Sequence, residues 1–157
     1  MRIFRKFMIA TVFAAMTPMA ALAAPVELAS EVFVERTETD ANGKAAVKLV
    51  AATNVVPGDT LRFVINYANA SDEAATDFII TNPLPASVAF VGSEGDALVE
   101  LSVDGSRFGK LASLSVVGDD GTPRAARPDD VTHVRWTFAD AIPAGASGTV
   151  LYRGRLR

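Results

Sequence analysis

The sequence predicts an all-β protein, a sandwich or barrel of about eight or nine short strands. Apolar and polar residues alternate in several short segments, which is the pattern of half-buried strands. Pro, Gly, Asn or Asp, the residues that favour turns, bound each segment. Beyond the N-terminal segment, no stretch keeps the apolar period of a helix.

The N-terminal segment has the pattern of a secretory signal peptide. Basic residues come first, Phe7–Ala15 is apolar, and Ala21-Leu22-Ala23 has the small residues that signal peptidase recognises. The alternative is a retained membrane anchor, but Pro18 interrupts the run and spanning a bilayer needs about 20 apolar residues. We therefore expect a signal peptide over residues 1–23 and a single exported domain over residues 24–157, with no membrane span after processing.

The charge balance and the lack of cysteine exclude several kinds of partner and site. Of 15 basic and 18 acidic residues, three basic ones lie in the predicted signal peptide, so the mature chain has a net charge of −6. An acidic domain gives no reason to expect nucleic-acid binding. Without cysteine there is no disulfide, thiolate zinc site or Cys nucleophile. Stability must come from the hydrophobic core.

The first predicted strand covers Val26–Thr39, and its apolar residues of one phase are Val26, Leu28, Val32 and Val34. Asp40–Gly43 is a turn, and Lys44–Thr53 can pair back. Two destinations are open for Val26–Thr39. It folds as an edge strand of its own sandwich, because short connections join neighbours, or it adds to the sheet of a second subunit and the protein associates with itself.

The next strand follows a turn in the stretch "VVPGDTLRFVINYANAS", Val55–Ser71. Pro57-Gly58 suits the centre of a type II turn, and Asp59 can bond the backbone nearby. The inward residues of the strand are Leu61, Phe63, Ile65 and Tyr67, and the outward ones are Arg62, Val64 and Asn66. Asn69-Ala70-Ser71-Asp72 ends the strand as a turn.

The middle of the chain repeats this pattern in three short runs, Thr76–Thr81, Val88–Val91 and Ala97–Val103. Asp104-Gly105 predicts a hairpin whose returning strand comes from Ser106–Val117. Residues 119–130 form a polar loop that contains proline.

Two strands complete the domain. Val131–Phe138 alternates, with Val134, Trp136 and Phe138 inward and His133 and Arg135 outward. This phase favours Trp136 as a core residue over an exposed platform for sugars. A second Pro and Gly turn then leads to the last strand, whose inward residues are Val150, Tyr152 and Leu156.

Four stretches share the pattern of a known family: "VVPGDTLRFVINYANAS", "FIITNPLPASVAFV", "LSVDGSRFG" and "VTHVRWTFADAIPAGASGTVLYRGRLR". In this order they resemble the bacterial conserved-repeat family called domain of unknown function eleven, over roughly residues 47–157. The resemblance implies an immunoglobulin-like antiparallel β-sandwich from exported surface proteins, often in tandem copies, without catalytic residues to transfer. This chain differs in having one copy, and Asn82 where the family commonly has Asp.

The residues do not point to catalysis or to a metal site. The one histidine, His133, is expected on the solvent side of its strand, with no serine and buried carboxylate near it in sequence to complete a triad. Asp119-Asp120 and Asp129-Asp130 could supply calcium ligands, but their spacing matches no calcium loop, and turn-forming aspartates are the simpler interpretation. We expect no catalytic residue, no cofactor and no bound metal.

One group of basic residues stands out on this acidic domain. Arg153, Arg155 and Arg157 share the outward phase of the last strand. In an immunoglobulin-like order that strand pairs with the strand of His133 and Arg135, which makes a basic stripe. The stripe, Arg135 included, is a candidate docking face for an envelope protein or an anionic glycan. The alternative is that these charges only solubilise a terminal strand and prevent edge-to-edge pairing.

The sequence therefore predicts a non-enzymatic, exported structural or interaction module of a bacterial cell envelope, in the periplasm or on the cell surface. The alternative is a soluble periplasmic module that binds a glycan or another anionic ligand.

Overall fold

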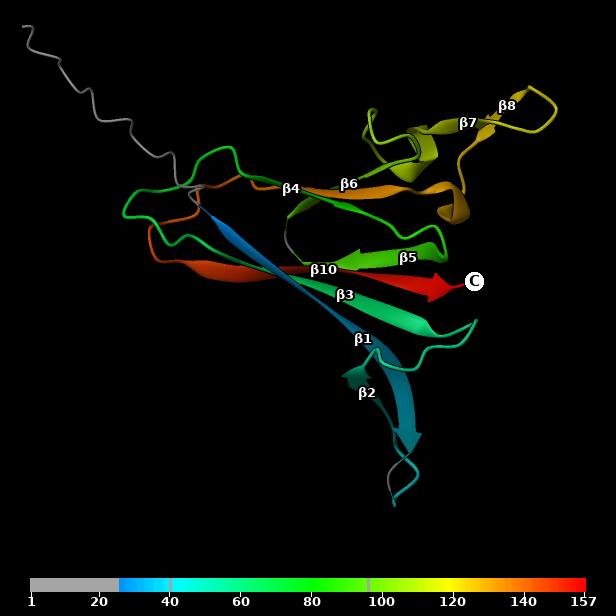
Figure 1. Ribbon diagram of the computed structural model, residues 1–157, viewed down its shortest axis with the longest axis horizontal. Helices are drawn as coiled ribbons and strands as arrows, with labels where there is room; N and C mark the ends of the chain where they lie inside the picture. The colour runs from blue at the N-terminus through cyan, green and yellow to red at the C-terminus, as the bar shows by residue number, and fades with distance from the viewer. Residues whose placement is uncertain (1–25, 40, 96) are drawn as a thin grey trace, which may run out of the picture.

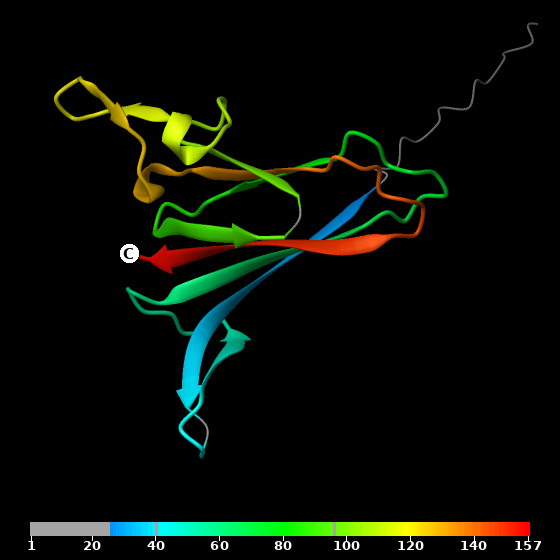
Figure 2. The same ribbon diagram turned by 180° about the vertical axis from the view of Figure 1, so that it is seen from behind.

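Figures 1 and 2 show the computed structural model, which describes residues 26–39, 41–95 and 97–157, from two opposite sides. The predicted signal peptide over residues 1–23 and its cleavage site lie outside the described residues. Ten β-strands, two short 3-10 helices and no α-helix are found in the described residues, which confirms the predicted all-β fold. In this part of the chain no helix has the length and apolar character needed to cross a membrane.

The strands form three antiparallel sheets. The largest has the order β2 (Ala45–Ala51), β1 (Glu27–Thr39), β3 (Thr60–Ala68), β10 (Ser147–Leu156) and β5 (Val88–Glu94). The second has the order β4 (Ile79–Pro83), β9 (His133–Thr137) and β6 (Leu98–Ser102). A small third sheet pairs β7 (Ser115–Val117) with β8 (Pro123–Ala125), and the 3-10 helices are η1 (Leu111–Ser113) and η2 (Pro128–Asp130).

The two larger sheets lie face to face as the layers of a β-sandwich, and the core fills the space between them. The residues between the layers come from strands of both sheets: Val34, Leu61, Phe63, Ile65, Val88, Val150 and Tyr152 from one, and Ile80, Leu101, Val134 and Trp136 from the other. Burial of this apolar surface is the main stabilising contribution to the fold.

The predicted turn before β3 is confirmed. The Asp59 amide donates to the Val56 carbonyl over 3.0 Å, and Gly58 has the positive φ of 95° that this position of the turn needs. The Asp59 carboxylate also accepts a hydrogen bond from the Val56 amide at 2.9 Å. The turn therefore sets the phase in which Leu61, Phe63 and Ile65 are buried.

Trp136 and Tyr152 are the largest fully buried side chains, and their ring centroids lie 6.0 Å apart. Tyr152 also stacks on Phe63 with ring centroids at 4.5 Å and nearly parallel planes. The prediction that Trp136 belongs to the core is confirmed. Burial raises the pKa of the Tyr152 phenol well above its usual range, because the phenolate would lose its hydration.

The predicted pairing of the last strand is wrong. β10 lies between β3 and β5, whereas β9 lies between β4 and β6 in the opposite layer. Alternation shows which side of a strand is buried, but it does not show which strands are neighbours. Arg135 and the three arginines of the C-terminal strand therefore belong to different sheets.

The hairpin predicted after β6 is also wrong in its second half. Only an isolated bridge between Leu101 and Gly109 returns along β6, and the chain then enters η1 and the separate β7–β8 hairpin. The Asp104 carboxylate accepts hydrogen bonds from the amides of Ser106 and Arg107, at 2.8 and 2.9 Å. These amides are thereby bonded within the loop and do not form a ladder with β6.

The segment Val26–Thr39 lies within the sheet of its own chain. β1 pairs with β3 over Glu27–Val34 and with β2 over Phe33–Thr39. The segment therefore folds into its own sandwich, but the prediction of an edge strand is wrong, because β2 is the edge strand and β1 lies between β2 and β3. Of its predicted inward residues, Val34 is fully buried, but Leu28 is 53 % exposed. Val26 and Val34 are buried in the same phase on either side of it, so the burial of this face of β1 is interrupted at Leu28 and Val32.

Candidate functional site

The arginines predicted as a docking face do not form one stripe. Arg153 lies on the outer face of the five-stranded sheet within 3.8 Å of Glu35 and 3.6 Å of Glu94. The neighbouring Arg62 donates from Nε to Glu35 at 2.9 Å. Arg153 is therefore one member of a group with two arginines and two glutamates, and most of its charge is balanced locally.

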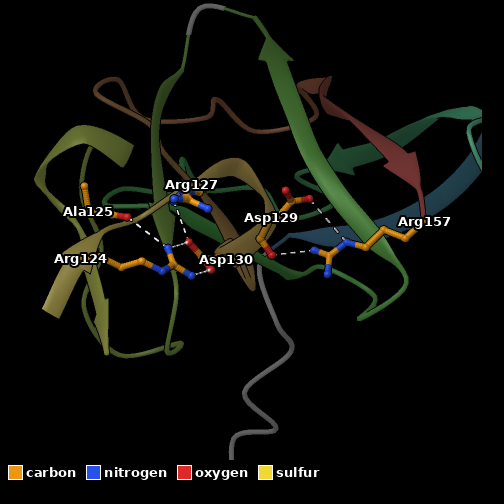
Figure 3. A network of polar contacts seen from close by, with 6 residues as sticks. All are labelled: Arg124, Ala125, Arg127, Asp129, Asp130 and Arg157. Atoms are coloured by element: carbon orange, nitrogen blue, oxygen red, sulfur yellow. Dashed lines mark hydrogen bonds and ion pairs between the residues drawn. The ribbon is translucent and has the colours of Figure 1, made fainter. Parts of the chain in front are cut away.

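Arg155 follows on β10, and Arg157 comes directly after the end of this strand. The Arg157 guanidinium donates to the Asp129 carbonyl at 2.6 Å and to the Val88 carbonyl at 3.3 Å. It thereby ties η2 to the edge of the five-stranded sheet, as Figure 3 shows for Asp129. Arg155 is exposed, as Arg157 is, whereas Arg153 is half-buried.

Arg135 lies on the outer face of the other sheet. Its guanidinium carbon is 3.4 Å from the ring centroid of Phe108, which is a cation–π contact. Its Nε donates to Thr81 Oγ1 at 3.3 Å, and His133 lies beside the same phenylalanine ring. Docking of a partner at these four arginines stays a prediction. It now concerns two separate surfaces, one at Arg135 and one at Arg153, Arg155 and Arg157.

The aspartates that were weighed as calcium ligands make contacts within the protein. Arg124 binds the Asp130 carboxylate with two hydrogen bonds, of 2.6 and 2.7 Å, and the Arg127 amide donates to the same group at 2.7 Å (Figure 3). The Arg124 guanidinium is the main reason why the pKa of Asp130 is lowered to about 2. Asp120 caps a turn by accepting from the Thr122 amide at 3.0 Å. The turn-forming role is therefore confirmed for Asp120 and Asp130.

A projecting hairpin is the surface feature that the sequence interpretation missed. We call it the β1–β2 arm: Phe33–Thr39 of β1 with Ala45–Ala51 of β2. Figure 1 shows it at the bottom of the view, beyond β3 and pointing away from the three-stranded sheet. The hairpin itself was predicted. Its position outside the second layer was not, because that position depends on how many strands the other sheet contains.

The β2 half of one face of the β1–β2 arm is apolar and exposed. Alternation along β2 places Ala45, Val47, Leu49 and Ala51 on the same side. Val47 is 61 % exposed and Leu49 is 40 % exposed. Val47 and Leu49 are neighbours on one side of the strand, so together they form a small apolar patch, and such a patch is a candidate contact surface.

The base of the arm is fixed to the sandwich. The Arg36 guanidinium pairs with both carboxylate oxygens of Asp59, with Nη2 to Oδ2 at 2.9 Å. This pairing lowers the pKa of Asp59, since the hydrogen bond from Arg36 favours the carboxylate. Val50 packs against the core from the same side of the arm. The arm is therefore held at its base and open at its tip.

Comparisons with protein-family models, with curated proteins and with solved structures find no match for this chain. The resemblance to domain of unknown function eleven accordingly stays a hypothesis carried by the four stretches quoted above. The described residues also contain no group of three or more acidic, histidine or cysteine side chains that could hold a metal ion.

Proposed function

We propose that the chain is an exported structural or interaction module of a bacterial cell envelope, and that it binds its partner through the β1–β2 arm. Export is the expectation from residues 1–23, and the envelope is the expectation from the family resemblance. The arm supplies the means of contact.

The observation that supports this proposal is the apolar side of the arm, with Val47 and Leu49 in solvent on a hairpin that projects from the sandwich. Exposed apolar clusters on soluble domains mark contact surfaces. β2 is also the last strand of its sheet, so its outer backbone groups can accept a further strand. Both features favour an interaction with protein.

The alternative function, a soluble periplasmic module for a glycan or anionic ligand, has one observation in its favour. Arg135 over Phe108 presents a cation and an aromatic ring on the outer face of the three-stranded sheet. Its other candidate residues are less available, because Arg153 and Arg157 contact acidic groups of the same chain. We therefore favour the arm.

Two variants of the full chain separate these functions. Val47→Asp with Leu49→Asp makes the arm polar, and Val117→Asp with Leu98→Asp is the matched control, because these two residues are also exposed and lie elsewhere. Intact cells are treated with a cross-linker, and the captured partners are identified by mass spectrometry. The arm variant should lose the envelope partners that the wild type and the control retain. The processed protein should begin at Ala24.

Release of the wild type with osmotic shock fluid, with capture unaffected by the arm variant, would overturn the proposal. Loss of glycan binding on Arg135→Ala would then support the alternative. An intact Met1 in the envelope fraction would contradict the signal peptide and favour a membrane anchor.

A further inference from the structure

Among the described residues, the five-stranded sheet has three stretches of backbone edge without a strand partner. The outer edge of β5 is one of them, at the far end of the sheet, and the other two lie beside the β1–β2 arm. One of these two is the outer edge of β2, which ends the sheet on that side. The other is the side of β1 that faces β2, over Glu27–Glu31, because β2 pairs with Phe33–Thr39 and the Ala52 amide bonds to the Val32 carbonyl. Glu27–Glu31 are all exposed. Each edge presents backbone donors and acceptors to solvent.

The directions of these backbone groups follow from one hydrogen bond. The Ala52 amide donates to the Val32 carbonyl at 3.4 Å, so the backbone groups of Val32 point to the β2 side. Backbone direction alternates along an antiparallel strand. Leu28 and Ser30 therefore direct their N–H and C=O groups to the open side of β1. By the same alternation, Ala45, Val47 and Leu49 direct theirs to the outer edge of β2.

We propose that β2 of a second copy of this chain pairs antiparallel with the open edge of β1, with Val47 of the second copy opposite Leu28. This inference rests on the proposed function and names the partner of the arm. In this register Ser30 lies opposite Ala45. The residues of β1 whose N–H and C=O groups point to the open edge therefore face the residues of β2 whose groups point outward, and the two strands can exchange hydrogen bonds.

The side chains in this register are complementary in charge and in polarity. Glu27 lies opposite Lys48 of the second copy. Glu31 then lies opposite Lys44, because the two glutamates are four residues apart and so are the two lysines. Leu28, exposed in the single chain, is covered by Val47 on the other face. Opposite charges and apolar pairs at facing positions both stabilise antiparallel strands. Lys48 contacts Glu38 of its own chain at 3.2 Å, so its ammonium would lie between two carboxylates.

Pairing of like edges is disfavoured. Two copies of Glu27–Glu31 place Glu27 and Glu31 of one copy opposite or diagonal to the same carboxylates of the other. Two copies of β2 do the same with Lys44 and Lys48. Like charges at these positions repel. Charge therefore favours the pairing of the open edge of β1 with the outer edge of β2. Because these are two different surfaces of one chain, their pairing leads to an open-ended assembly unless it closes into a ring.

The register also separates the bulky parts of neighbouring copies. Lys48 has the phase of Val50, which packs toward the core, whereas Glu27 has the phase opposite to that of the buried Val34. Pairing these two residues therefore turns the second copy over, and its three-stranded sheet falls on the other side of the shared strands. Within one chain Val47 faces Thr37, whereas in the proposed register it faces Leu28 of the other copy, nine residues earlier in β1. Each copy is therefore shifted along the strand direction by nine residues, about 30 Å, relative to the previous one.

Charge reversal tests this pairing with the full chain, purified as the cell processes it. The variants are Glu27→Lys with Glu31→Lys, Lys44→Glu with Lys48→Glu, and all four changes together. Asp119→Lys with Asp140→Lys is the control for net charge at two exposed positions. Sedimentation velocity over a range of protein concentration and salt measures association, and near-UV circular dichroism confirms that each variant is folded.

The wild type and the control should form species larger than dimers, which dissociate as salt rises. Each double variant should associate more weakly by about tenfold or more, because two attractive pairs become repulsive. The fourfold variant should regain association, and an equal mixture of the two double variants should assemble although neither does so alone.

Three results would overturn the pairing. A wild type that stays monomeric at all concentrations excludes it. A discrete dimer that is weakened by Lys44→Glu with Lys48→Glu and not by Glu27→Lys with Glu31→Lys indicates another partner surface for β2. Failure of the fourfold variant to recover excludes the stated register. If self-association fails but Val47→Asp with Leu49→Asp still abolishes envelope capture, the proposed function stands and the partner is a different protein.

Discussion

Asn82 of β4 donates a hydrogen bond from Nδ2 to the phenol oxygen of Tyr152 of β10, 3.0 Å away, and so joins the two layers of the sandwich through a polar contact beside the core. The same Nδ2 lies 3.0 Å from the Pro83 carbonyl. An amide can serve both acceptors, whereas the Asp that the resembling family commonly has at this position could only accept.

A double-mutant cycle measures this contact. Asn82→Ala and Tyr152→Phe should each destabilise the protein, and the double variant should lose less than the sum, with a coupling of about 1 kcal/mol. Urea unfolding of the four proteins supplies the values. Additive losses would show that the hydrogen bond contributes nothing to stability.

Trp136 should be the most costly core residue to truncate. Trp136→Ala should lower the free energy of unfolding by about 3 to 5 kcal/mol, since it removes the largest buried side chain. Trp136→Phe should cost less, about 1 to 2 kcal/mol, because the indole N–H has no hydrogen-bond partner among the described residues. Blue-shifted fluorescence of the native protein should accompany these losses. An unchanged melting curve for Trp136→Ala would place the indole at the surface.

Asn69 should be the most sensitive polar residue. It is buried, and its Nδ2 reaches the carbonyls of Glu73, Ile142 and Pro143 at 2.8, 2.9 and 3.1 Å. Asn69→Ala leaves these acceptors without their donor and should cost about 2 to 4 kcal/mol. The control is Asn66→Ala, whose amide contacts only exposed side chains. Equal losses for the two variants, in thermal or urea unfolding, would contradict this role.

Asp130 should make stability depend on pH in the acid range. Its pKa in the folded protein, about 2, is below the value of about 4 of an unfolded chain. A lowered pKa means that the carboxylate stabilises the fold above pH 4 and that this contribution is lost as pH falls toward 2. Asp130→Asn should therefore be less stable than the wild type at pH 7, with a difference that shrinks between about pH 4 and 2. Denaturant unfolding at a series of pH values measures it, and a constant difference would exclude the ion pair with Arg124 as the cause.

The sequence predicted what each strand buries better than it predicted the strand's neighbours. Leu61, Phe63 and Ile65, and Val134 and Trp136, are buried as their alternation indicates. Alternation reports on one strand at a time, and so it could not show that β10 pairs with β3 and β5. The proposed basic stripe depended on that pairing, which is why Arg135 proved to lie on a separate surface.

Two other residues show where local patterns fail. Leu28 has the phase of a core residue, yet it is 53 % exposed between Val26 and Val34, which are both buried. Burial depends on what packs above a residue, and the sequence of β1 does not encode that. Asn69 has the look of a turn residue, and its bonds to Ile142 and Pro143 connect positions far apart in the chain. No signal within its own segment could have revealed them.

The exposure of Val47 and Leu49 on the arm affects how the protein can change over generations. Substitutions at Val47 or Leu49 alter what the tip touches, but they remove little of the burial that holds the sandwich together, so most should fall within the small range typical of surface positions. Trp136 and Tyr152 have no such freedom. Under the proposed function, a lineage could therefore change the partner of the arm by drift in a few exposed residues while selection keeps the core constant.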